Sequence, residues 1–270
     1  MLNVSIVLYH TDIREVTALV DILRGSNFVN TIFLIDNSET KNPDFELLPA
    51  TYLFNGKNLG YGAAHNIAIQ QTLTQHIPYH LVVNSDIYFQ SESIGQLLDF
   101  MENHQDIGSL MPKIFYPDEK IQYLCKLIPT PLDLFGRRFL PRKWMQKRIE
   151  RFELQQFGYD KIMNVPYLSG CFMLLRSEAL KKVGLFDERF FMYPEDIDLT
   201  RRIREHYRTI FYPHVSVIHN HAQGSYKSKK LLWVHIINLI KYFNKWGWFC
   251  DKKRQLINKE TLNQFKNNEL

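Results

Sequence analysis

The chain has 270 residues, of which 45% are hydrophobic and 23% are charged. This composition is typical of a globular protein, and it excludes a disordered or fibrous chain. The net charge is +5, and the excess of Lys and Arg lies in two segments, residues 137–151 and the C-terminal third from residue 226 onward.

The three cysteines, Cys125, Cys171 and Cys250, are scattered and form no Cys-x-x-Cys pair. This argues against a disulfide framework and against a zinc ribbon. The N-terminal residues lack the pattern of a secretory signal, and no apolar run reaches the roughly 18 residues that a membrane-spanning helix needs. We therefore expect a cytoplasmic chain, either free or peripheral on the inner face of the plasma membrane.

The first half of the chain alternates between strand-like and helix-like segments. Short apolar runs predict strands at residues 4–9, 31–36 and 80–86, and helical spacing predicts helices at 13–23 and 60–73. Strands that alternate with helices indicate parallel β-α-β units with both faces of the sheet covered. The predicted fold class is α/β.

The predicted strands of this half run into polar residues at their carboxyl ends. These residues are His10-Thr11-Asp12, Asp36-Asn37-Ser38 and Asn84-Ser85-Asp86. In parallel sheets, ligands bind outside the carboxyl ends of the strands. Three polar ends on one edge therefore predict a ligand site there.

The second half departs from this alternation after residue 105. Residues 109–125 predict two short strands around a Pro-Asp turn. The pattern beyond residue 165 predicts a strand at 171–175 and a helix at 177–183 that ends at Gly184. An acidic helix start follows at 190–199, and two more strands are predicted within 207–225. No internal repeat or low-complexity linker is present, so we expect one domain over residues 1–227 and a helical tail over 228–270.

The acidic helix start, FFMYPEDIDL, places Glu195, Asp196 and Asp198 directly after Pro194. Pro is favoured at the first position of a helix, and acidic side chains complement the positive end of the helix dipole. The alternative is that one carboxylate is held against the preceding aromatic residues so that it can act as a general base. Taken alone, the pattern favours the helix start.

Two polar segments are candidate metal ligands. Mg²⁺ is usually held by one or two carboxylates plus substrate phosphates, so Asp86 and the amide oxygen of Asn84 fit a site that a diphosphate completes. The alternative is a turn, which Asn, Ser and Asp all favour after a strand. Near the end of the last predicted strand, one of His219 and His221 fits a further ligand, and two ordinary surface histidines explain them equally well.

Residues 58–66, NLGYGAAHN, join a Gly-rich loop to a helix with two Ala in its first turn. Small residues let the backbone approach a ligand or a neighbouring element closely. The segment matches neither the Walker loop nor G-x-G-x-x-G, so a tight turn before a closely packed helix explains it almost as well as phosphate binding.

The basic segments interleave Lys and Arg with Trp and Phe, which fits an anionic membrane surface. The alternative is a solvated basic helix whose aromatic side chains pack on the core. No DNA-binding or RNA-binding motif accompanies these residues, so we expect no nucleic-acid partner.

The motifs together resemble those of family 2 inverting glycosyltransferases, in particular a rhamnosyltransferase-like branch that builds bacterial surface polysaccharides. In chain order they are SIVLYHTD, DNS, NLGYGAAHN, NSD, the run SGCFMLLRSEALKKVGLFDERFFMYPEDIDLTRRI, and HNHAQGS, within roughly residues 3–226. The resemblance implies a GT-A fold, with a single Rossmann-like, mostly parallel sheet flanked by helices. It also implies a nucleotide-diphosphate sugar donor and a divalent cation, Mg²⁺ or Mn²⁺.

The resemblance also implies roles for residues on the donor side. Asp36 matches the residue that recognises the donor base, and Asn58, Gly60 and Asn66 lie in the segment that helps to form the nucleotide pocket. Asn84 and Asp86 match the D-x-D position, with Asp86 as the metal-binding acid. Asn at the first place departs from that motif. His221 matches the late metal or diphosphate histidine better than its rival His219.

For the chemical step, the resemblance implies that Asp196 is the catalytic base. Glu195, Asp198 and Gly170 complete the predicted substrate-binding set, and the aromatic residues before Pro194 would form a wall of the acceptor site. The base removes the proton of an acceptor hydroxyl while that oxygen attacks the anomeric carbon, opposite the leaving nucleotide diphosphate. No Cys or Ser nucleophile is required.

The implied partners are a nucleotide-diphosphate sugar, with dTDP-rhamnose as the first choice, and a glycan or lipid-linked saccharide acceptor. Residues 137–151 lie where the family varies most and fit an anionic lipid-linked acceptor, and Trp233, Trp246 and Trp248 would dock the tail on the membrane. Two alternatives stay open: a sugar nucleotidyltransferase, which would need a basic Gly-rich loop near the first strand, and a non-catalytic membrane-associated scaffold with the same fold.

Overall fold

A computed structural model describes residues 1–137, 140–220 and 229–265. Within these residues, nine strands form a central sheet in the order β3-β2-β1-β4-β10-β6-β11-β5, with β8 paired to β11. The bounds are β1 Leu2–Leu8, β2 Val29–Asp36, β3 Thr51–Phe54, β4 Tyr79–Val83, β5 Ile87–Tyr88, β6 Ile107–Phe115, β8 Met163–Asn164, β10 Phe172–Arg176 and β11 Arg208–His219.

Most of these strands point in one direction. The pairs β3-β2, β2-β1, β1-β4 and β6-β11 are parallel, and β10 lies antiparallel between β4 and β6. The short strands β5 and β8 run antiparallel to β11. The predicted α/β class with a mostly parallel sheet is therefore confirmed.

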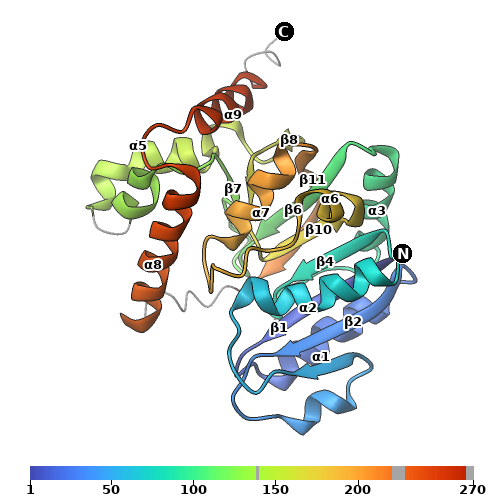
Figure 1. Ribbon diagram of the computed structural model, residues 1–270. Helices are drawn as coiled ribbons and strands as arrows, with labels where there is room; N and C mark the ends of the chain where they lie inside the picture. Colours follow the sequence, from blue (N-terminus) through green and yellow to red (C-terminus); the bar gives the residue numbers. More distant parts are fainter. Residues whose placement is uncertain (138–139, 221–228, 266–270) are drawn as a thin grey trace.

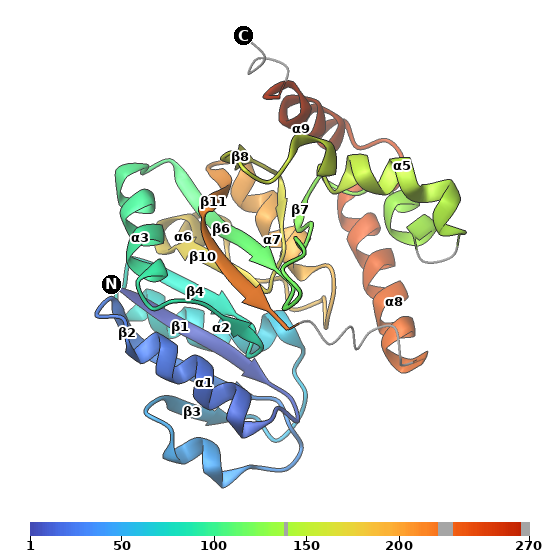
Figure 2. The same ribbon diagram turned by 180° about the vertical axis from the view of Figure 1, so that it is seen from behind.

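Helices cover both faces of the sheet (Figures 1 and 2). The apolar stripes of α1 (Ile13–Arg24) and α3 (Ser93–Asn103) pack on one face in a cluster that includes Leu19 and Leu97. On the other face, α2 (Tyr61–Thr74), α6 (Ser177–Val183) and α7 (Glu195–Arg204) bury a second cluster that includes Met173 and Leu199. Since both faces are covered, the strands are apolar almost throughout.

Two predicted helix starts are confirmed, and each has a local cause. The side chain of Asp12 accepts a hydrogen bond from the backbone N–H of Arg14 (2.9 Å) and so caps α1. Gly60 precedes α2 with φ +89° and ψ 170°, a conformation that is essentially restricted to glycine.

Two expectations for the second half were wrong. Residues 109–124 contain one strand, β6, and a turn closed by a hydrogen bond from the Tyr116 N–H to the Lys120 carbonyl (2.8 Å). The expected second strand is reduced to an isolated bridge at Ile121, and β7 begins only at Cys125. Of the range 207–225, in which two strands were predicted, residues 221–225 lie outside the described residues, and the rest contains the single strand β11. Its register against β6 shifts between Tyr212 and Ser216, where Pro213 has no N–H to donate, and the strand continues beyond this irregularity.

A further layer lies beyond the sheet edge near α7 (Figure 1). It contains a two-stranded sheet and several helices: β7 (Cys125–Lys126) with β9 (Tyr167–Leu168), η2 (Leu132–Gly136), α5 (Arg142–Phe152), η3 (Gln155–Phe157), α8 (Lys229–Trp246) and α9 (Lys252–Asn263). The short helix η1 (Pro43–Leu47) lies instead before β3. Among the helices that the structure describes, none is both long and apolar enough to cross a bilayer.

The expected helical tail consists of α8 and α9, and α8 packs against α7. Asp198, which is fully buried, accepts hydrogen bonds from Trp246 Nε1 (2.8 Å) and Arg202 Nε (2.9 Å) and pairs with Lys245 Nζ (2.5 Å). Arg201 forms a second buried ion pair with Asp251 (2.7 Å). The tail is thus joined to the helix that begins at the predicted base.

The aromatic residues of the tail do not all face outward as expected. The indole of Trp246 packs against the core, with the Arg201 guanidinium 4.0 Å from its ring centroid. Trp248 stacks on Phe135 with ring centroids 6.3 Å apart. Only Trp233 of the three predicted membrane-docking residues is largely exposed, at 66%. The sequence could not separate the two faces because both faces of α8 carry large apolar residues.

Candidate active site

The carboxyl ends of the parallel strands bring the predicted polar residues to one edge of the sheet. Asp36 ends β2, Asn84 follows β4, and His219 ends β11 beside Asp86, which precedes β5. The edge predicted from the three polar strand ends is therefore where these side chains lie.

Asp36 is fully buried, and both of its carboxylate oxygens are bonded within the protein. Oδ1 accepts the Ser38 backbone N–H (2.9 Å), and Oδ2 accepts the Tyr52 hydroxyl (2.7 Å). Burial, and then the bond to Asp36, raise the pKa of Tyr52. These contacts fix the end of β2. The role of Asp36 in recognising the donor base stays a prediction.

The Gly-rich segment packs against the loop that precedes α7. Gly60 donates its N–H to Asn58 Oδ1 (2.9 Å), and its carbonyl accepts Asn37 Nδ2 (3.1 Å). A Cβ on Gly60 would lie 2.2 Å from the carbonyl oxygen of Phe191, which also accepts the Tyr61 N–H (2.9 Å). Close packing thus explains why glycine occupies this position.

Asn66 connects the same helix to that loop. Its Nδ2 donates to the Phe186 carbonyl (2.9 Å) and to Glu188 Oε1 (3.0 Å), and its Oδ1 accepts the Phe186 N–H (3.0 Å). The amide is buried and fully used in these bonds. Its place in the nucleotide pocket therefore stays a prediction, while its structural role is clear.

Asp86 and His219 form the candidate metal centre. His219 Nε2 lies 3.2 Å from Asp86 Oδ1, and both side chains are largely buried. His219 Nδ1 donates to Gln122 Oε1 (2.9 Å), while Gln122 Nε2 donates to the His219 carbonyl (2.8 Å). A metal-binding histidine typically donates its second ring N–H to such an acceptor, which orients the other nitrogen towards the ion. The two side chains therefore fit a divalent cation.

The surroundings of this pair set its protonation. Burial alone lowers the pKa of His219, but the hydrogen bonds to Asp86 and Cys171 outweigh it and raise the pKa to about 10. Glu15, which accepts a hydrogen bond from the Ser85 hydroxyl, has its own pKa raised by burial. In the ranges described above, no cluster of three or more His, Cys, Asp or Glu side chains is arranged to hold a metal ion. Substrate phosphate would have to complete the shell.

His221, the first choice for the late histidine, lies outside the described residues. The observed contacts of His219 support the rival assignment. Nε2 of His219 also lies 3.5 Å from Asn84 Nδ2, so Asn84 faces this centre as well.

Asp196 lies at the start of α7 and remains partly exposed. Its Oδ2 accepts the Gly170 N–H (3.0 Å) and the Tyr167 hydroxyl (3.3 Å), and its Oδ1 accepts the Ile197 N–H (2.8 Å). Burial raises the pKa of Asp196, although the N–H donors of Gly170 and Ile197 and the charge of Lys126 oppose the rise. The carboxylate is thus held in one orientation with an elevated proton affinity, as a general base requires.

The two carboxylates beside Asp196 have different environments. Glu195 is buried and its Oε2 has no hydrogen-bond partner within the described structure; burial, and then the charge of Asp196, raise the pKa of Glu195 well above its usual value. Asp198 is bonded to Trp246, Lys245 and Arg202, as described above. Asp198 therefore stabilises the helix start, and substrate contact by either residue stays a prediction.

One tyrosine joins the candidate metal centre to the candidate base. The Tyr61 hydroxyl lies 3.0 Å from Asn84 Oδ1 and 2.8 Å from the Gly170 carbonyl oxygen, while the Gly170 N–H binds Asp196. A Cβ on Gly170 would lie 3.3 Å from the Asp196 Cβ and 3.5 Å from Tyr61. Gly170 therefore lets these two side chains approach each other.

The predicted aromatic wall is only partly present. Phe190 is 1% exposed and packs in the core, with its ring centroid 6.5 Å from that of Tyr242. Tyr193 is 37% exposed, and its ring centroid lies 5.0 Å from that of His235 in α8. Phe191, two residues before Tyr193, contributes its carbonyl to the Gly60 loop.

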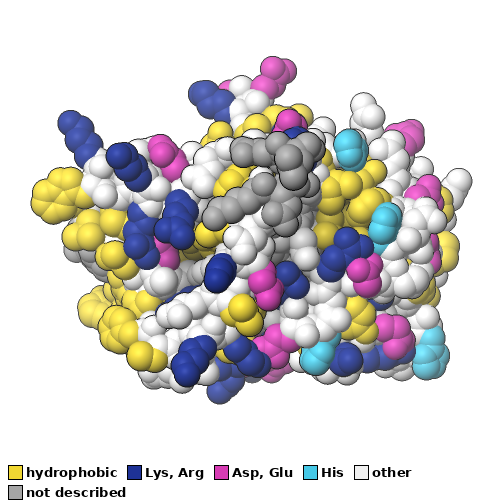
Figure 3. Space-filling view, turned by 90° about the horizontal axis from the view of Figure 1, so that it is seen from above, with side chains coloured by type: hydrophobic (Ala, Val, Ile, Leu, Met, Phe, Trp, Pro, Cys, Tyr) yellow, Lys and Arg dark blue, Asp and Glu magenta, His cyan; other side chains and the backbone are white. Residues whose placement is uncertain are grey.

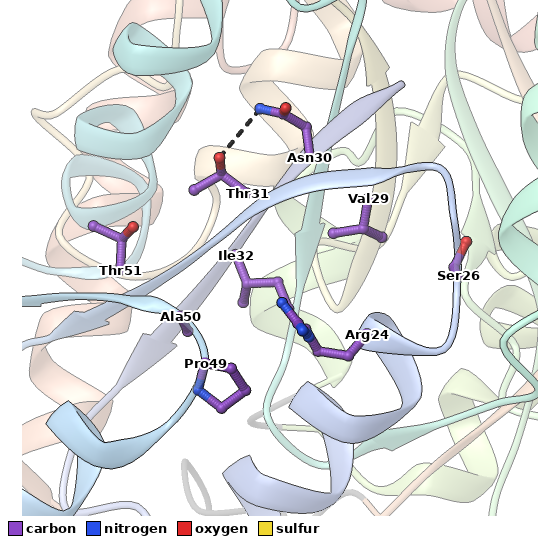
Figure 4. A pocket seen from close by; sticks show the side chains of 9 residues that line it. All are labelled: Arg24, Ser26, Val29, Asn30, Thr31, Ile32, Pro49, Ala50 and Thr51. Carbon is purple, nitrogen blue, oxygen red and sulfur yellow. Dashed lines mark hydrogen bonds between the residues drawn. The ribbon is translucent and has the colours of Figure 1, made fainter.

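Sequence reasoning missed residues that complete the site, namely Gln122, Tyr167 and Glu15. Tyr61 lies within a segment that the sequence had singled out. The other three carry no local signal, because each acts through a partner far away in the chain, such as His219 for Gln122. A surface hollow lined by Arg24, Asn30 and Pro49 lies at the amino ends of β2 and β3, away from the strand ends that carry the site (Figure 4).

Comparison with known proteins adds an independent observation. The family model described as "Glycosyl transferase family 2" matches residues 16–184. The chain is 30% identical over 213 residues to an N-acetylglucosaminyl-diphospho-decaprenol L-rhamnosyltransferase of Mycobacterium tuberculosis (strain ATCC 25618 / H37Rv), covering 72% of this chain and 68% of the relative. It is 26% identical over 199 residues to the rhamnosyltransferase WbbL of Escherichia coli (strain K12), covering 70% and 71%.

Solved structures agree on the fold. GalNAc-T7 with UDP, GalNAc and Mn²⁺ has a TM-score of 0.62 at 14% identity, covering 93% of this chain and 48% of its own, so this chain spans about half of that protein. A mannosyltransferase from Pyrobaculum calidifontis in complex with GDP-Man and Mn²⁺ has a TM-score of 0.57 at 13% identity, covering 98% and 73%. The predicted GT-A fold is confirmed. Asp196 and His219 both lie beyond the residues that the family model matches.

Proposed function

The chain belongs to glycosyl transferase family 2 and transfers a sugar, and on that premise we propose that it moves L-rhamnose from dTDP-rhamnose to a hydroxyl of a lipid-linked saccharide, with inversion. The relatives named as rhamnosyltransferases support the sugar, and one of them is named for a diphospho-decaprenol acceptor. The orientation of Asp196 carries the mechanism. The nucleotidyltransferase and scaffold alternatives lose their support, because the family match is to enzymes that transfer sugars.

Asp196 performs the proton transfer. The Gly170 N–H and the Tyr167 hydroxyl hold Oδ2, so the carboxylate keeps one orientation while the acceptor hydroxyl approaches. Its elevated pKa makes it a better proton acceptor than an exposed aspartate. The acceptor oxygen then attacks the anomeric carbon, the glycosidic bond forms, the bond to the nucleotide diphosphate breaks, and the proton remains on Asp196.

The leaving diphosphate needs positive charge near Asp86. Asp86 and His219 would hold a divalent cation, which stabilises negative charge on the leaving group when bound. A mixed carboxylate and imidazole set favours Mn²⁺ over Mg²⁺, because Mg²⁺ prefers oxygen ligands in a strict octahedron. Gln122 orients the imidazole for this purpose.

The test is donor binding and turnover with a panel of nucleotide sugars in Mn²⁺ or Mg²⁺. We expect one donor to bind in a metal-dependent manner, Asp86→Ala to abolish that binding, and Asp196→Asn to keep binding while losing turnover. Asp118→Asn, which alters an exposed carboxylate in a turn, is the matched control. Failure of every nucleotide sugar to bind with either metal would overturn the assignment of the site.

We also propose that the face formed by α5 and α8 rests on an anionic membrane, where a lipid-linked acceptor would be found. Trp144 and Trp233 are 77% and 66% exposed, and Lys143 and Lys147 lie exposed beside Trp144 on α5. Figure 3 shows hydrophobic and basic side chains interspersed on the side of the molecule where these helices lie. Exposed aromatic rings next to Lys are typical of membrane-surface helices.

Vesicle flotation tests this contact. Phosphatidylcholine vesicles with phosphatidylglycerol should carry the chain, and pure phosphatidylcholine vesicles should not. The double variant Trp144→Ser/Trp233→Ser should lose binding, whereas Leu47→Ser, at an 82% exposed residue before β3, should keep it. Equal binding by both variants would exclude this face.

A further inference from the structure

We propose that Lys126 binds a phosphate of the acceptor and so selects phosphorylated acceptors over neutral ones. The inference rests on the proposed function, because it requires Asp196 to face the acceptor. The charge of Lys126 lowers the pKa of Asp196, but no substrate contact has been assigned to it. A lysine ammonium is a compact donor that suits phosphate oxygens.

The side chain of Tyr167 connects Lys126 to the candidate base, Asp196. It belongs to β7, where it pairs in register with Tyr167 of β9. Its Nζ lies 5.1 Å from the centroid of the Tyr167 ring, and the hydroxyl of the same ring donates to Asp196 Oδ2 (3.3 Å). An acceptor whose hydroxyl reaches Asp196 therefore passes close to this ammonium group.

The side chain of Lys126 is largely buried, and it has no counter-ion within the part of the chain that the structure describes. Lys126 is 8% exposed, and among the described residues its Nζ forms no hydrogen bond or ion pair; the contact with the Tyr167 ring is its polar interaction there. The two carboxylates whose charge acts on Lys126 already have other partners: Glu153 pairs with Arg137 (3.1 Å), and Asp196 accepts three hydrogen bonds. A buried, unpaired charge is costly, so an anion from outside the chain is the partner that this position lacks.

A second cation strengthens the positive field on this side. Arg137, at the end of η2, has a side chain that is 35% exposed. Burial, and then the charge of Arg137, lower the pKa of Lys126, and a bound phosphate would reverse that shift. By contrast, the candidate metal centre is lined by the acids Asp86 and Glu15. A divalent cation at that centre would bind the donor diphosphate, so Lys126 is available to bind a phosphate of the acceptor.

The experiment compares two acceptors that carry the same sugar, one a short prenyl-diphosphate glycoside and the other a neutral alkyl glycoside. Lys126→Met removes the charge and keeps the apolar stem, Lys126→Arg restores a charge, and Lys181→Met, which alters an exposed lysine of α6, is the control. We expect Lys126→Met to raise the KM of the diphosphate acceptor by about 10- to 100-fold, the value of one charge-assisted hydrogen bond. The KM values of the neutral acceptor and of the donor should stay within about twofold, and Lys126→Arg should recover part of the loss.

Three outcomes would overturn the inference. An equal loss with both acceptors would show a structural role, a changed KM for the donor would assign Lys126 to the donor diphosphate, and a shifted pH profile alone would show that Lys126 only tunes Asp196. Fluorescence titration with the diphosphate acceptor in the absence of donor separates this inference from the proposed function. If the wild-type chain binds that acceptor but transfers no sugar, the proposed function fails. In that case, weaker binding by Lys126→Met than by the wild type still supports the phosphate contact, and equal binding refutes it.

Discussion

Gly60 offers a quantitative test of how the Gly-rich loop positions the base. Gly60→Ala places a Cβ 2.2 Å from the Phe191 carbonyl oxygen, whereas Gly56→Ala places one no closer than 3.6 Å from the Phe54 ring. Both glycines have positive φ, +89° and +64°, so both substitutions strain the backbone. Only Gly60→Ala adds a collision with backbone atoms.

The structure gives the magnitude of the difference. Backbone strain costs about 1–2 kcal/mol for Gly56→Ala. Gly60→Ala adds the displacement of the Phe191 carbonyl and the loss of its hydrogen bond from Tyr61, about 1–2 kcal/mol more. Because Phe191 lies five residues before Asp196, we also expect kcat to fall by about tenfold or more, since small misplacements of a catalytic group are costly.

Urea denaturation followed by circular dichroism measures the free energy of unfolding, and initial rates with the donor found in the binding panel measure kcat. Gly56→Ala should lose stability while keeping wild-type kcat. The reasoning fails if the two variants are equally stable and Gly60→Ala keeps full activity, because the loop would then yield to the extra methyl group without moving the base.

Three further predictions concern individual side chains. Asp198→Asn should lower the free energy of unfolding by about 1.5–3 kcal/mol, because it weakens charge-assisted bonds to the partly buried Lys245 and Arg202, although Lys245 keeps its pair with Asp187. Asp106→Asn, at an exposed pair, should cost less than about 1 kcal/mol, and urea titrations compare the two variants. Activity should rise with pH as Asp196 loses its proton. Tyr167→Phe removes a hydrogen bond that lowers the Asp196 pKa, so it should move this rise to higher pH. An unchanged pH–rate profile would contradict the contact between Tyr167 and Asp196. His219→Ala should weaken Mn²⁺ binding by at least about tenfold in a paramagnetic titration, and undiminished binding would exclude His219 as a ligand.

Local signals in the sequence were enough to predict β1, β2, β4, α1 and α2, whereas β3, α3 and β5 were not predicted. Apolar residues at helical spacing predicted α1, a Gly-rich opening predicted α2, and uninterrupted apolar runs predicted the strands around them. Prediction failed within residues 207–220, where two strands were expected and β11 is one strand that continues past Pro213 through a shift of register.

The candidate site was likewise predicted only in part from the sequence. Asp86 and Asp196 stood out because they occur in dense polar motifs. Gln122 and Lys126 did not, because their importance comes from contacts with His219, 97 residues away, and with Tyr167 across the small sheet. Such pairings are set by the packing of distant segments, which the spacing of residues along one chain does not reveal.

The buried links between α7 and the tail have a consequence for engineering. A fragment ending at residue 228 would retain the whole matched family region and every predicted site residue, yet Asp198 would lose Lys245 and keep only Arg202 as its cation, and Arg201 would lose Asp251. The interior rings of Tyr242 and Phe243 would be missing as well. Exchange of tails between relatives would therefore require the matching residues of α7 to be exchanged too. In such chimeras, α7 and the C-terminal helices α8 and α9 have to be treated as one unit.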